Sequence, residues 1–553
     1  MSRSRLVRLV PCLLLLAPPL SADEAVPEEV TPPERVQIEA LPEPPPEAVT
    51  AGNMDEAPLL HGRLQLSLED AIKMGLENNL NVQVERYSPI IAGYDEDIAW
   101  GAYDPTLFAE FGYGDNRTAN SSLLFGTDTT VDRSTDGFGG FRGIVPLLST
   151  EYSAQFDGQK LDTNRGTASL TPEYTSSWGL TLTQPVLKDL IWNQPWTQVR
   201  TSVLLRDSSE EGFRQAVMDE VRDIETAYWT LVANDEAQKI ARKSLETAKA
   251  LLDQTQTQYD VGVVSKVEVT EAEAGLSQRE FSLIRAENTY RNQQDVLINL
   301  VLGPGLRSNS TLEIDASDRP DDFKPYEVDV EKAVQNAFEN RPEIVSALRE
   351  IERQEVQLQF AKNQRLPELD GIFSFGGNGV SGDSNPNPGF GQPPAPDQGG
   401  FRRSFDDYDD ATVYTARARV SIPFPNTVAR KTSDKTEIEL SRARTRMRRL
   451  EQDIIIEVRR SARDLRASQE GIVAAQAAER AASEQLRAER IRLEYGESTP
   501  FDVLQREEDL VDRENELIGA FQAWLVSSVS LDRAQGTILR NRSIAIGEVR
   551  RLP

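Results

Sequence analysis

The sequence has very few of the side chains that most catalytic and metal sites use, with one cysteine and one histidine in 553 residues. Cys12 lies in an N-terminal segment that we expect to be removed, which leaves no thiol for disulfides or for thiolate metal ligands. His61 has no second histidine with which to form an acid–base pair or a histidine metal cluster. We therefore predict that the protein is not an enzyme and that it holds no metal and no cofactor.

Long apolar runs are also absent. No segment after the N-terminus has the run of about 18 apolar residues that marks a transmembrane helix. If such a chain enters a membrane, it must do so as strands closed into a barrel, because backbone polar groups have to be paired in lipid. Basic residues are too few to balance the acidic ones, and the formal net charge is −28. This excess of negative charge disfavours nucleic acid as a partner.

The N-terminal segment has the pattern of an export signal. Three arginines among the first eight residues precede an apolar run, and small residues stand before Asp23. The pattern predicts a signal peptide over residues 1–22. The alternative, a short membrane anchor, is disfavoured because prolines interrupt the apolar run. Residues 23–62 are rich in proline and glutamate and have too few large apolar side chains to fold, so we expect a disordered leader.

The rest of the chain contains an internal repeat. Leu66–Ile72 matches Val328–Val334 at a spacing of 262 residues, and Tyr259–Gly262 aligns with Leu493–Gly496 at a spacing of 234. The first half therefore has an insertion of 28 residues between its two helical regions. Two matching blocks in the same order indicate a duplication.

Each half is predicted to contain a long helical hairpin. No proline stands between Pro195 and Pro304, and Leu204–Tyr259 alone would form a helix of 56 residues, about 84 Å long. Apolar residues recur every seven positions, which is typical of coiled-coil packing. In one helix these residues are Leu276, Leu283, Tyr290 and Leu297. Gly262 and Gly496 have the backbone freedom that the two turns need.

Strands are expected at 107–184 in the first half and at 369–422 in the second, where apolar and polar residues alternate. Residues 116–136 and 376–410 are rich in glycine, asparagine, aspartate and serine, so we expect exposed loops there. The added length of the first half includes Thr150–Phe156, which also has a strand pattern. The sequence leaves open whether this segment lengthens the strands or forms an extra hairpin.

Over residues 64–536 the chain resembles the TolC family of outer-membrane efflux proteins. The resemblance rests on the duplicated opening Leu66–Ala71, on Leu182–Pro185 after a strand and on the two helix turns. It implies a mixed α and β fold in which each protomer gives four transmembrane strands to a trimeric twelve-stranded β-barrel, continuous with a long coiled-coil α-barrel in the periplasm. The implied partners are two further copies, the outer-membrane lipid, a periplasmic adaptor (membrane fusion protein) and an inner-membrane pump.

The resemblance also implies which residues meet these partners. The hairpin tips would dock the adaptor, and acidic side chains after the second tip would narrow the periplasmic entrance. The tip residues are Val261, Gly262, Val263, Val264, Ser265, Gly496, Glu497, Ser498, Thr499 and Pro500, and the entrance residues are Glu268, Asp502 and Gln505. Gln505 stands where well-known relatives have a second aspartate, so we expect a weaker charge gate here. Helix capping is the competing role for Asp502.

The expected order of segments covers the whole chain. It is signal peptide (1–22), leader (23–62), first repeat (63–305), linker (306–325), second repeat (326–536) and C-terminal tail (537–553). The function that this order favours is an outer-membrane channel subunit of a tripartite export system, carrying small molecules or secreted proteins. The alternative is a periplasmic or surface coiled-coil scaffold or adhesin without a channel.

Overall fold

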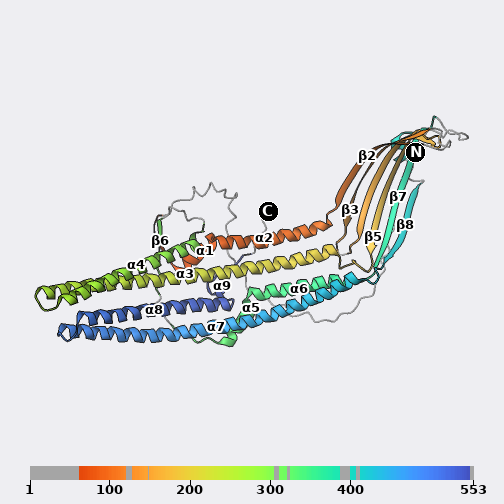
Figure 1. The fold of residues 1–553 in the computed structure, drawn as a ribbon. Helices are drawn as coiled ribbons and strands as arrows, with labels where there is room; N and C mark the ends of the chain where they lie inside the picture. Colours follow the sequence, from red (N-terminus) through yellow and green to blue (C-terminus); the bar gives the residue numbers. More distant parts are fainter. Residues whose placement is uncertain are drawn as a thin grey trace, which may run out of the picture.

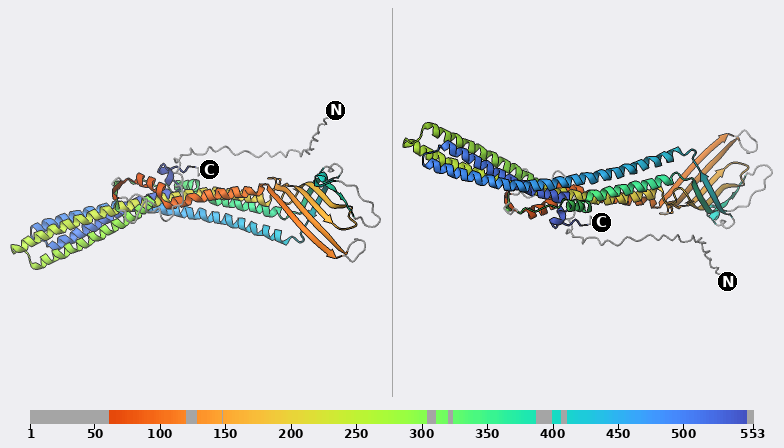
Figure 2. Two further views of the ribbon diagram at one scale, coloured as in Figure 1. Left: turned by 90° about the horizontal axis from the view of Figure 1, so that it is seen from above. Right: turned by 90° about the horizontal axis from the view of Figure 1, so that it is seen from below.

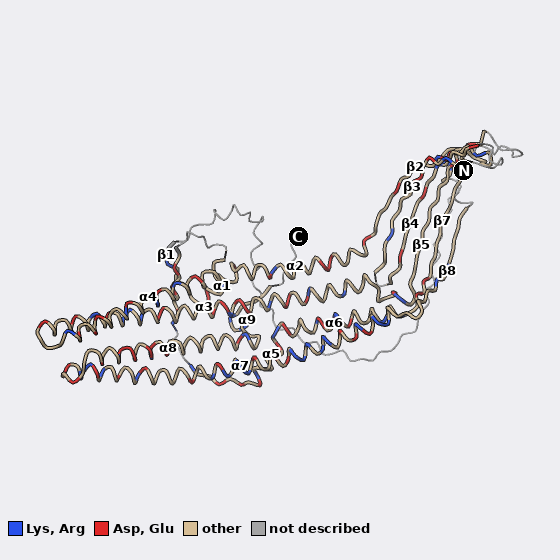
Figure 3. The backbone as a smooth tube through the Cα atoms, in the orientation of Figure 1, with Lys and Arg blue, Asp and Glu red and all other residues tan. Residues whose placement is uncertain are grey.

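The computed structural model describes residues 61–119, 128–146, 148–303, 311–319, 324–386, 399–405 and 411–547. The expected signal peptide and nearly all of the leader lie outside these residues. The described part is elongated, with a curved β-sheet at one end and two helical hairpins at the other (Figure 1). Both further views show the same separation of strands and helices along one axis (Figure 2). Charged residues are spread along the helices and are sparse on the strands (Figure 3).

The sheet has six antiparallel strands in the order β2-β3-β4-β5-β7-β8. Their bounds are Thr106–Ala119 (β2), Thr129–Ile144 (β3), Glu151–Thr163 (β4), Leu170–Pro185 (β5), Glu368–Ser384 (β7) and Thr412–Ser421 (β8). In the described residues neither β2 nor β8 pairs with a strand on its outer side. The sheet therefore ends in two open edges.

The two faces of the sheet differ in chemistry, because side chains alternate along each strand. The strand register aligns most of the large apolar side chains on one face: Leu107, Phe111, Tyr113, Phe141, Tyr152, Phe156, Trp178, Leu180, Phe373, Phe375, Tyr414 and Val420. The opposite face is mostly polar and includes Glu110, Asp136, Arg142, Gln155, Asp157, Ser177, Thr181, Ser374, Arg417 and Arg419, with Phe108, Phe138, Ile372 and Val413 among them. We call these the apolar face and the polar face.

Four helices lie side by side next to the sheet, in the order α2 (Leu80–Trp100), α3 (Gln194–Asp260), α6 (Pro342–Asn363) and α7 (Thr427–Glu494). They connect in the same order to β2, β5, β7 and β8. The helices α3 and α7 continue for 67 and 68 residues and pair with α4 (Lys266–Leu302) and α8 (Pro500–Ala534) to make the hairpins. None of the helices in the described part of the chain is both long enough and apolar enough to cross a bilayer.

The main core lies midway along the molecule. Here α1 (Leu68–Asn78) packs on α3 and α4, while α5 (Val330–Asn340) packs on α7. Large side chains of α3, among them Phe213, Ile224 and Tyr228, are fully buried there. The short parallel pair β1 (His61–Leu66) and β6 (Thr311–Ala316) and the helix α9 (Ile538–Asn541) cover this core.

The structure confirms a mixed α and β fold with two long helical hairpins and corrects several local predictions. The sheet has six strands instead of the expected four, and the segment with Thr150–Phe156 forms the extra hairpin β3–β4. The expected loop at 116–136 is partly strand, as is the start of the loop expected at 376–410. These strands were mistaken for loops because they are rich in glycine. At position 376 the strand needs glycine, since a Cβ there would lie 2.3 Å from the Trp178 carbonyl oxygen of β5.

Two further corrections concern the ends of the first repeat. The leader was expected to extend to residue 62, but β1 begins at His61. The expected linker 306–325 contains β6, which pairs with β1 across the chain. Each of these strands has only six residues and forms its backbone hydrogen bonds with a distant segment of the chain. The sequence around each strand is therefore too short to predict it.

Candidate functional site: the tips of the helical hairpins

Both hairpin turns lie at the end of the molecule farthest from the sheet (Figure 1). In the first turn α3 ends at Asp260 and α4 begins at Lys266, and in the second α7 ends at Glu494 and α8 begins at Pro500. The residues predicted as tips are therefore the ones that make the turns. The two tips are equivalent in the repeat and point in the same direction.

The first tip is a compact turn held by backbone hydrogen bonds. Gly262 has φ of +77°, a conformation that side chains with a Cβ rarely adopt. Its N–H donates to the Tyr259 carbonyl oxygen at 2.9 Å, and the Val263 N–H donates to the Gln258 carbonyl oxygen at 2.8 Å. Ser265 and Glu268 then form a capping box at the start of α4. The turn is thus rigidly attached to both helices.

The second tip repeats this geometry. Gly496 has φ of +73°, and the Glu497 N–H donates to the Arg492 carbonyl oxygen at 2.9 Å. Thr499 and Asp502 form the capping box of α8, and Pro500 occupies the first turn, where a missing N–H costs nothing. In both repeats the glycine adopts a positive φ and the hydroxyl residue three positions later caps the next helix. These two requirements explain why both residue types recur at this spacing.

The carboxylate of Asp502 is engaged in capping. It accepts hydrogen bonds from the Thr499 Oγ1 at 2.7 Å and from the Thr499 N–H at 3.2 Å. These hydrogen bonds favour the charged form and lower the pKa of Asp502 below its ordinary value. Glu268 accepts from the Ser265 N–H at 3.4 Å in the same manner, while Gln505 is exposed. Within one chain, no described contact brings Glu268 and Asp502 together.

The two hairpins are joined near their tips by polar contacts that sequence reasoning missed. Arg279 of α4 is buried, and its Nη2 donates to the Leu504 carbonyl oxygen at 3.5 Å and lies 3.8 Å from the Glu508 carboxylate. Glu507 of α8 is also buried, and burial raises its pKa. Its carboxylate lies 3.7 Å from Arg490 of α7, which belongs to the same hairpin. No sequence signal distinguishes these residues from the many solvated charges on the same helices.

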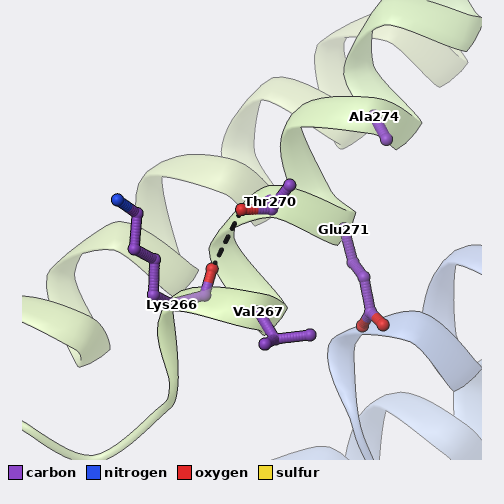
Figure 4. Close-up of a pocket in the computed structure, with 5 residues that line it drawn as sticks. All are labelled: Lys266, Val267, Thr270, Glu271 and Ala274. Carbon is purple, nitrogen blue, oxygen red and sulfur yellow. Dashed lines mark hydrogen bonds between the residues drawn. The ribbon is translucent and has the colours of Figure 1, made fainter.

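Apolar side chains are exposed around the first tip. Val261, Val263 and Val267 have relative exposures of 71%, 72% and 65%. A shallow depression of about 460 Å³ follows along α4, lined by Lys266, Val267, Thr270, Glu271 and Ala274. Val267 and Glu271 point toward the second hairpin, drawn pale blue in Figure 4. A turn exposed to solvent is expected to have polar side chains. The exposed valines therefore indicate a candidate contact surface.

A model of the family described as "Outer membrane efflux protein" matches residues 143–301 and 333–537, which together make up more than half of the chain. The chain belongs to the outer membrane efflux protein family. The second match spans α5 through α8 almost completely. The first begins in the last residues of β3, so that β2 and most of β3 lie outside the family model.

Solved structures of outer-membrane channels have the same fold as this outer membrane efflux protein. The Campylobacter jejuni outer membrane channel CmeC is 16% identical, with a TM-score of 0.60, over 86% of this chain and 89% of its own. The outer membrane protein VceC of Vibrio cholerae is 16% identical, with a TM-score of 0.58, over 85% and 96%. The open-state MtrE outer membrane channel of Neisseria gonorrhoeae is 15% identical, with a TM-score of 0.57, over 85% and 89%. These likenesses establish the fold.

Proposed function

We propose that the protein is the outer-membrane channel subunit of a tripartite export system and acts as a homotrimer. The observation that carries this proposal is the sheet, which has one apolar face, one polar face and two open edges. In lipid an open edge leaves unpaired backbone groups that cost several kcal/mol each. A single copy is therefore unsuited to the membrane, and copies must close the wall together.

The two faces fix the orientation of the sheet in this proposal. The apolar face, with aromatic residues such as Phe111 and Trp178, contacts lipid, and the polar face lines a water-filled passage. The helices continue from the same ends of the strands into the periplasm. At 1.5 Å per residue, the 67 residues of α3 span about 100 Å, so the passage extends far from the membrane.

The tips are the surface that meets the rest of the export system. They lie at the end of the helices farthest from the sheet, and the exposed side chains of Val261, Val263 and Val267 form an apolar contact area there. We assign this surface to a periplasmic adaptor, which connects the channel to an inner-membrane pump. Family membership supports the assignment, because efflux through the outer membrane needs an energised partner at the inner membrane.

Asp502 and Glu268 would place carboxylates around the entrance once copies assemble. A ring of like charges concentrates negative potential, and the capping hydrogen bonds of Asp502 favour its charged form by lowering its pKa. Gln505 adds no charge, so the gate is weaker than one with two acidic residues per chain. The cargo is a small molecule or a secreted protein; the pump selects between them, and the conduit accepts either.

The test is to fractionate membranes from cells that express the full chain and to run detergent extracts on gels with and without heating. A heat-sensitive trimer in the outer-membrane fraction, together with loss of export when the gene is deleted, is the expected result. A freely soluble monomer would contradict the proposal and favour the scaffold alternative. A membrane trimer whose deletion leaves export of every tested small molecule and protein unchanged would overturn the export role.

A further inference from the structure

We propose that the hairpin β3–β4 is a permanent part of the membrane wall, so that three copies close an eighteen-stranded wall through contacts between β2 of one copy and β8 of the next. This inference rests on the proposed function, since it assumes a trimer in the membrane. The outer mouth of such a wall is wider than that of a twelve-stranded channel. The partner that completes each open edge is a second copy of this chain.

The inserted strands have the same division of faces as the other four. On the apolar face, Phe141 of β3 and Tyr152 of β4 are in edge contact, with ring centroids 6.3 Å apart. On the polar face, Ser177 Oγ of β5 donates to the Asp157 carboxylate of β4 at 3.1 Å. A hairpin that served as a plug inside the passage would not need an apolar side facing lipid. The pattern fits a stretch of wall with lipid on one side and water on the other.

The base of the hairpin is anchored where the wall meets the helices. Ser149, in the β3–β4 turn, is buried, and its Oγ donates to the Leu190 carbonyl oxygen at 3.1 Å. Asn193, the N-cap of α3, also donates to this Ser149 Oγ. The Gln184 Nε2 donates to the Leu148 carbonyl oxygen at 2.9 Å. These contacts hold the turn against the β5–α3 connection, so the hairpin is fixed at its periplasmic end.

Six strands match the width of the helical layer beneath them. Four helices at 8–10 Å spacing span roughly 32–40 Å. Strands about 4.8 Å apart that tilt by about 40° take up about 6 Å of circumference each, so six of them span roughly 38 Å and four only about 25 Å. The layer formed by α2, α3, α6 and α7 is therefore continued by the six-stranded sheet with little change in diameter.

The edges are built to join identical copies. All neighbouring strands are antiparallel and their number is even, so β2 runs away from the helices and β8 runs back toward them. When β8 of one copy meets β2 of the next, the new pair is antiparallel too. Leu107 and Phe111 on β2 and Tyr414 on β8 all lie on the apolar face, so the lipid-facing surface continues across the junction.

The helical layer has matching free edges. One side of α2 carries apolar residues at alternating spacings of four and three, which is the seam of a coiled coil. These residues are Leu80, Val84, Tyr87, Ile91, Tyr94 and Ile98, and each is between 42% and 73% exposed. The helix at the other edge, α7, exposes Val428 and Ile438. Because α2 and α7 continue from β2 and β8, the same neighbouring copy covers the sheet edge and the helix edge.

A wider wall changes what the outer mouth can pass. Barrel diameter grows roughly in proportion to strand number, so eighteen strands give a mouth about half again as wide as twelve. Walls of about 16–18 strands leave an aqueous channel. The inserted hairpin adds Asp136, Asp157 and Arg142 to the polar face, so this mouth is lined by charged groups. A mouth of this kind can pass bulky hydrated cargo. Selection of cargo by size then takes place at the helical tips.

Electron cryo-microscopy of the full-length protein, extracted from outer membranes in detergent, tests the inference directly. The expected particle has threefold symmetry and eighteen strands in its membrane wall. A threefold particle with twelve wall strands and β3–β4 outside the wall would overturn the inference and leave the proposed function intact. A ring of another copy number would also overturn it. Absence of any membrane-embedded oligomer would instead count against the proposed function.

Disulfide crosslinking gives an independent measurement in the membrane. Leu107→Cys is combined in turn with Ala416→Cys, Ala418→Cys and Val420→Cys, since the register between copies sets which pair is closest. Within one copy these positions lie on opposite edges of the sheet, so a disulfide must join two copies and give dimers and trimers on a denaturing gel. The control Leu107→Cys with Leu180→Cys crosslinks only if β2 pairs with β5, and its crosslinking would overturn the inference.

Discussion

The guanidinium of Arg542 holds the carboxylate of Glu225 through two parallel hydrogen bonds, from Nε to Oε1 at 2.8 Å and from Nη2 to Oε2 at 2.7 Å. Glu225 is fully buried in α3, while Arg542 follows α9 near the end of the chain. This pair fastens the C-terminal segment to the central core. A buried carboxylate needs such a partner, because desolvation of an unpaired charge is costly.

Replacement of Arg542 by methionine is expected to destabilise the protein by about 3–5 kcal/mol, since it leaves a buried charge without its partner. The melting temperature of the detergent-solubilised protein measures the effect. The double variant Glu225→Gln with Arg542→Met is expected to recover most of the loss. Arg449→Met, which removes an exposed pair with Asp453, serves as control and is expected to cost less than about 1 kcal/mol. Equal melting of R542M and this control would refute the prediction.

A second buried cluster joins α6 to the end of α8. Glu343 accepts from Arg341 Nη2 and from Arg533 Nη2, both at 2.9 Å. Burial raises the pKa of Glu343, but the hydrogen bonds from Arg341 and the charge of Arg533 outweigh this and lower the pKa from 4.5 to about 2. A carboxylate with a lowered pKa in the folded state stabilises the protein above its unfolded pKa, and this contribution is lost as the pH falls through the folded value.

We expect Glu343→Gln to reduce stability by about 3 kcal/mol at neutral pH, and the difference from the natural protein to shrink between pH 4.5 and about 2. Thermal melts of the two proteins across this pH range give the difference directly. Glu484→Gln removes a carboxylate from an exposed pair with Arg487 and serves as the control, because such a pair contributes less than about 1 kcal/mol to stability. A constant difference between the natural protein and E343Q down to pH 2 would contradict the assignment.

The sequence predicted the long helices and both turns because their signals are local. Absence of proline allowed α3 and α7 to run without a break, and glycine followed by a capping hydroxyl residue marked each tip. Strands β3 and β7 were partly misread as loops, because glycine, aspartate and serine have low strand propensity. Pairing with neighbours across the sheet overrode this propensity, and sequence spacing alone does not reveal such pairing.

The polar contacts between the hairpins were beyond sequence analysis for a different reason. Arg279 and Glu507 stand among many charged residues on helices whose faces are mostly solvated, and only the packing of the first hairpin against α8 buries them. For the entrance residue Asp502, in contrast, the sequence did predict a structural role. Asp502 was predicted both as a cap and as an entrance residue, and the structure contains the cap. Its role at the entrance stays a prediction, because that role depends on neighbouring copies.

The positive φ of the two tip glycines makes them sensitive to β-branched side chains. Gly262→Val and Gly496→Val are expected to distort the turns, since a β-branched residue in this conformation costs on the order of 1–3 kcal/mol. We expect export to be abolished while the heat-sensitive trimer persists in the membrane. Gly471→Val, in the interior of α7 where an added Cβ would meet no other atom within 4 Å, is the matched control and is expected to export normally. Normal export by both tip variants would show that the turns are not docking sites.

The exposed valines of the first tip give a separate test of adaptor docking, because a charge there leaves the backbone unchanged. Val263→Asp and Val267→Asp place carboxylates on side chains that are 72% and 65% exposed. Loss of apolar contact and desolvation of a new charge are each costly at an interface, so we expect at least a tenfold loss of affinity for the adaptor. Co-purification of the adaptor with the trimer, and export in the same cells, measure the effect. Val296→Asp, on α4 but far from the tip and 49% exposed, is expected to retain both. If the tip variants bind the adaptor as well as V296D does, the prediction is wrong. The adaptor would then dock on the second tip or along the sides of the helices.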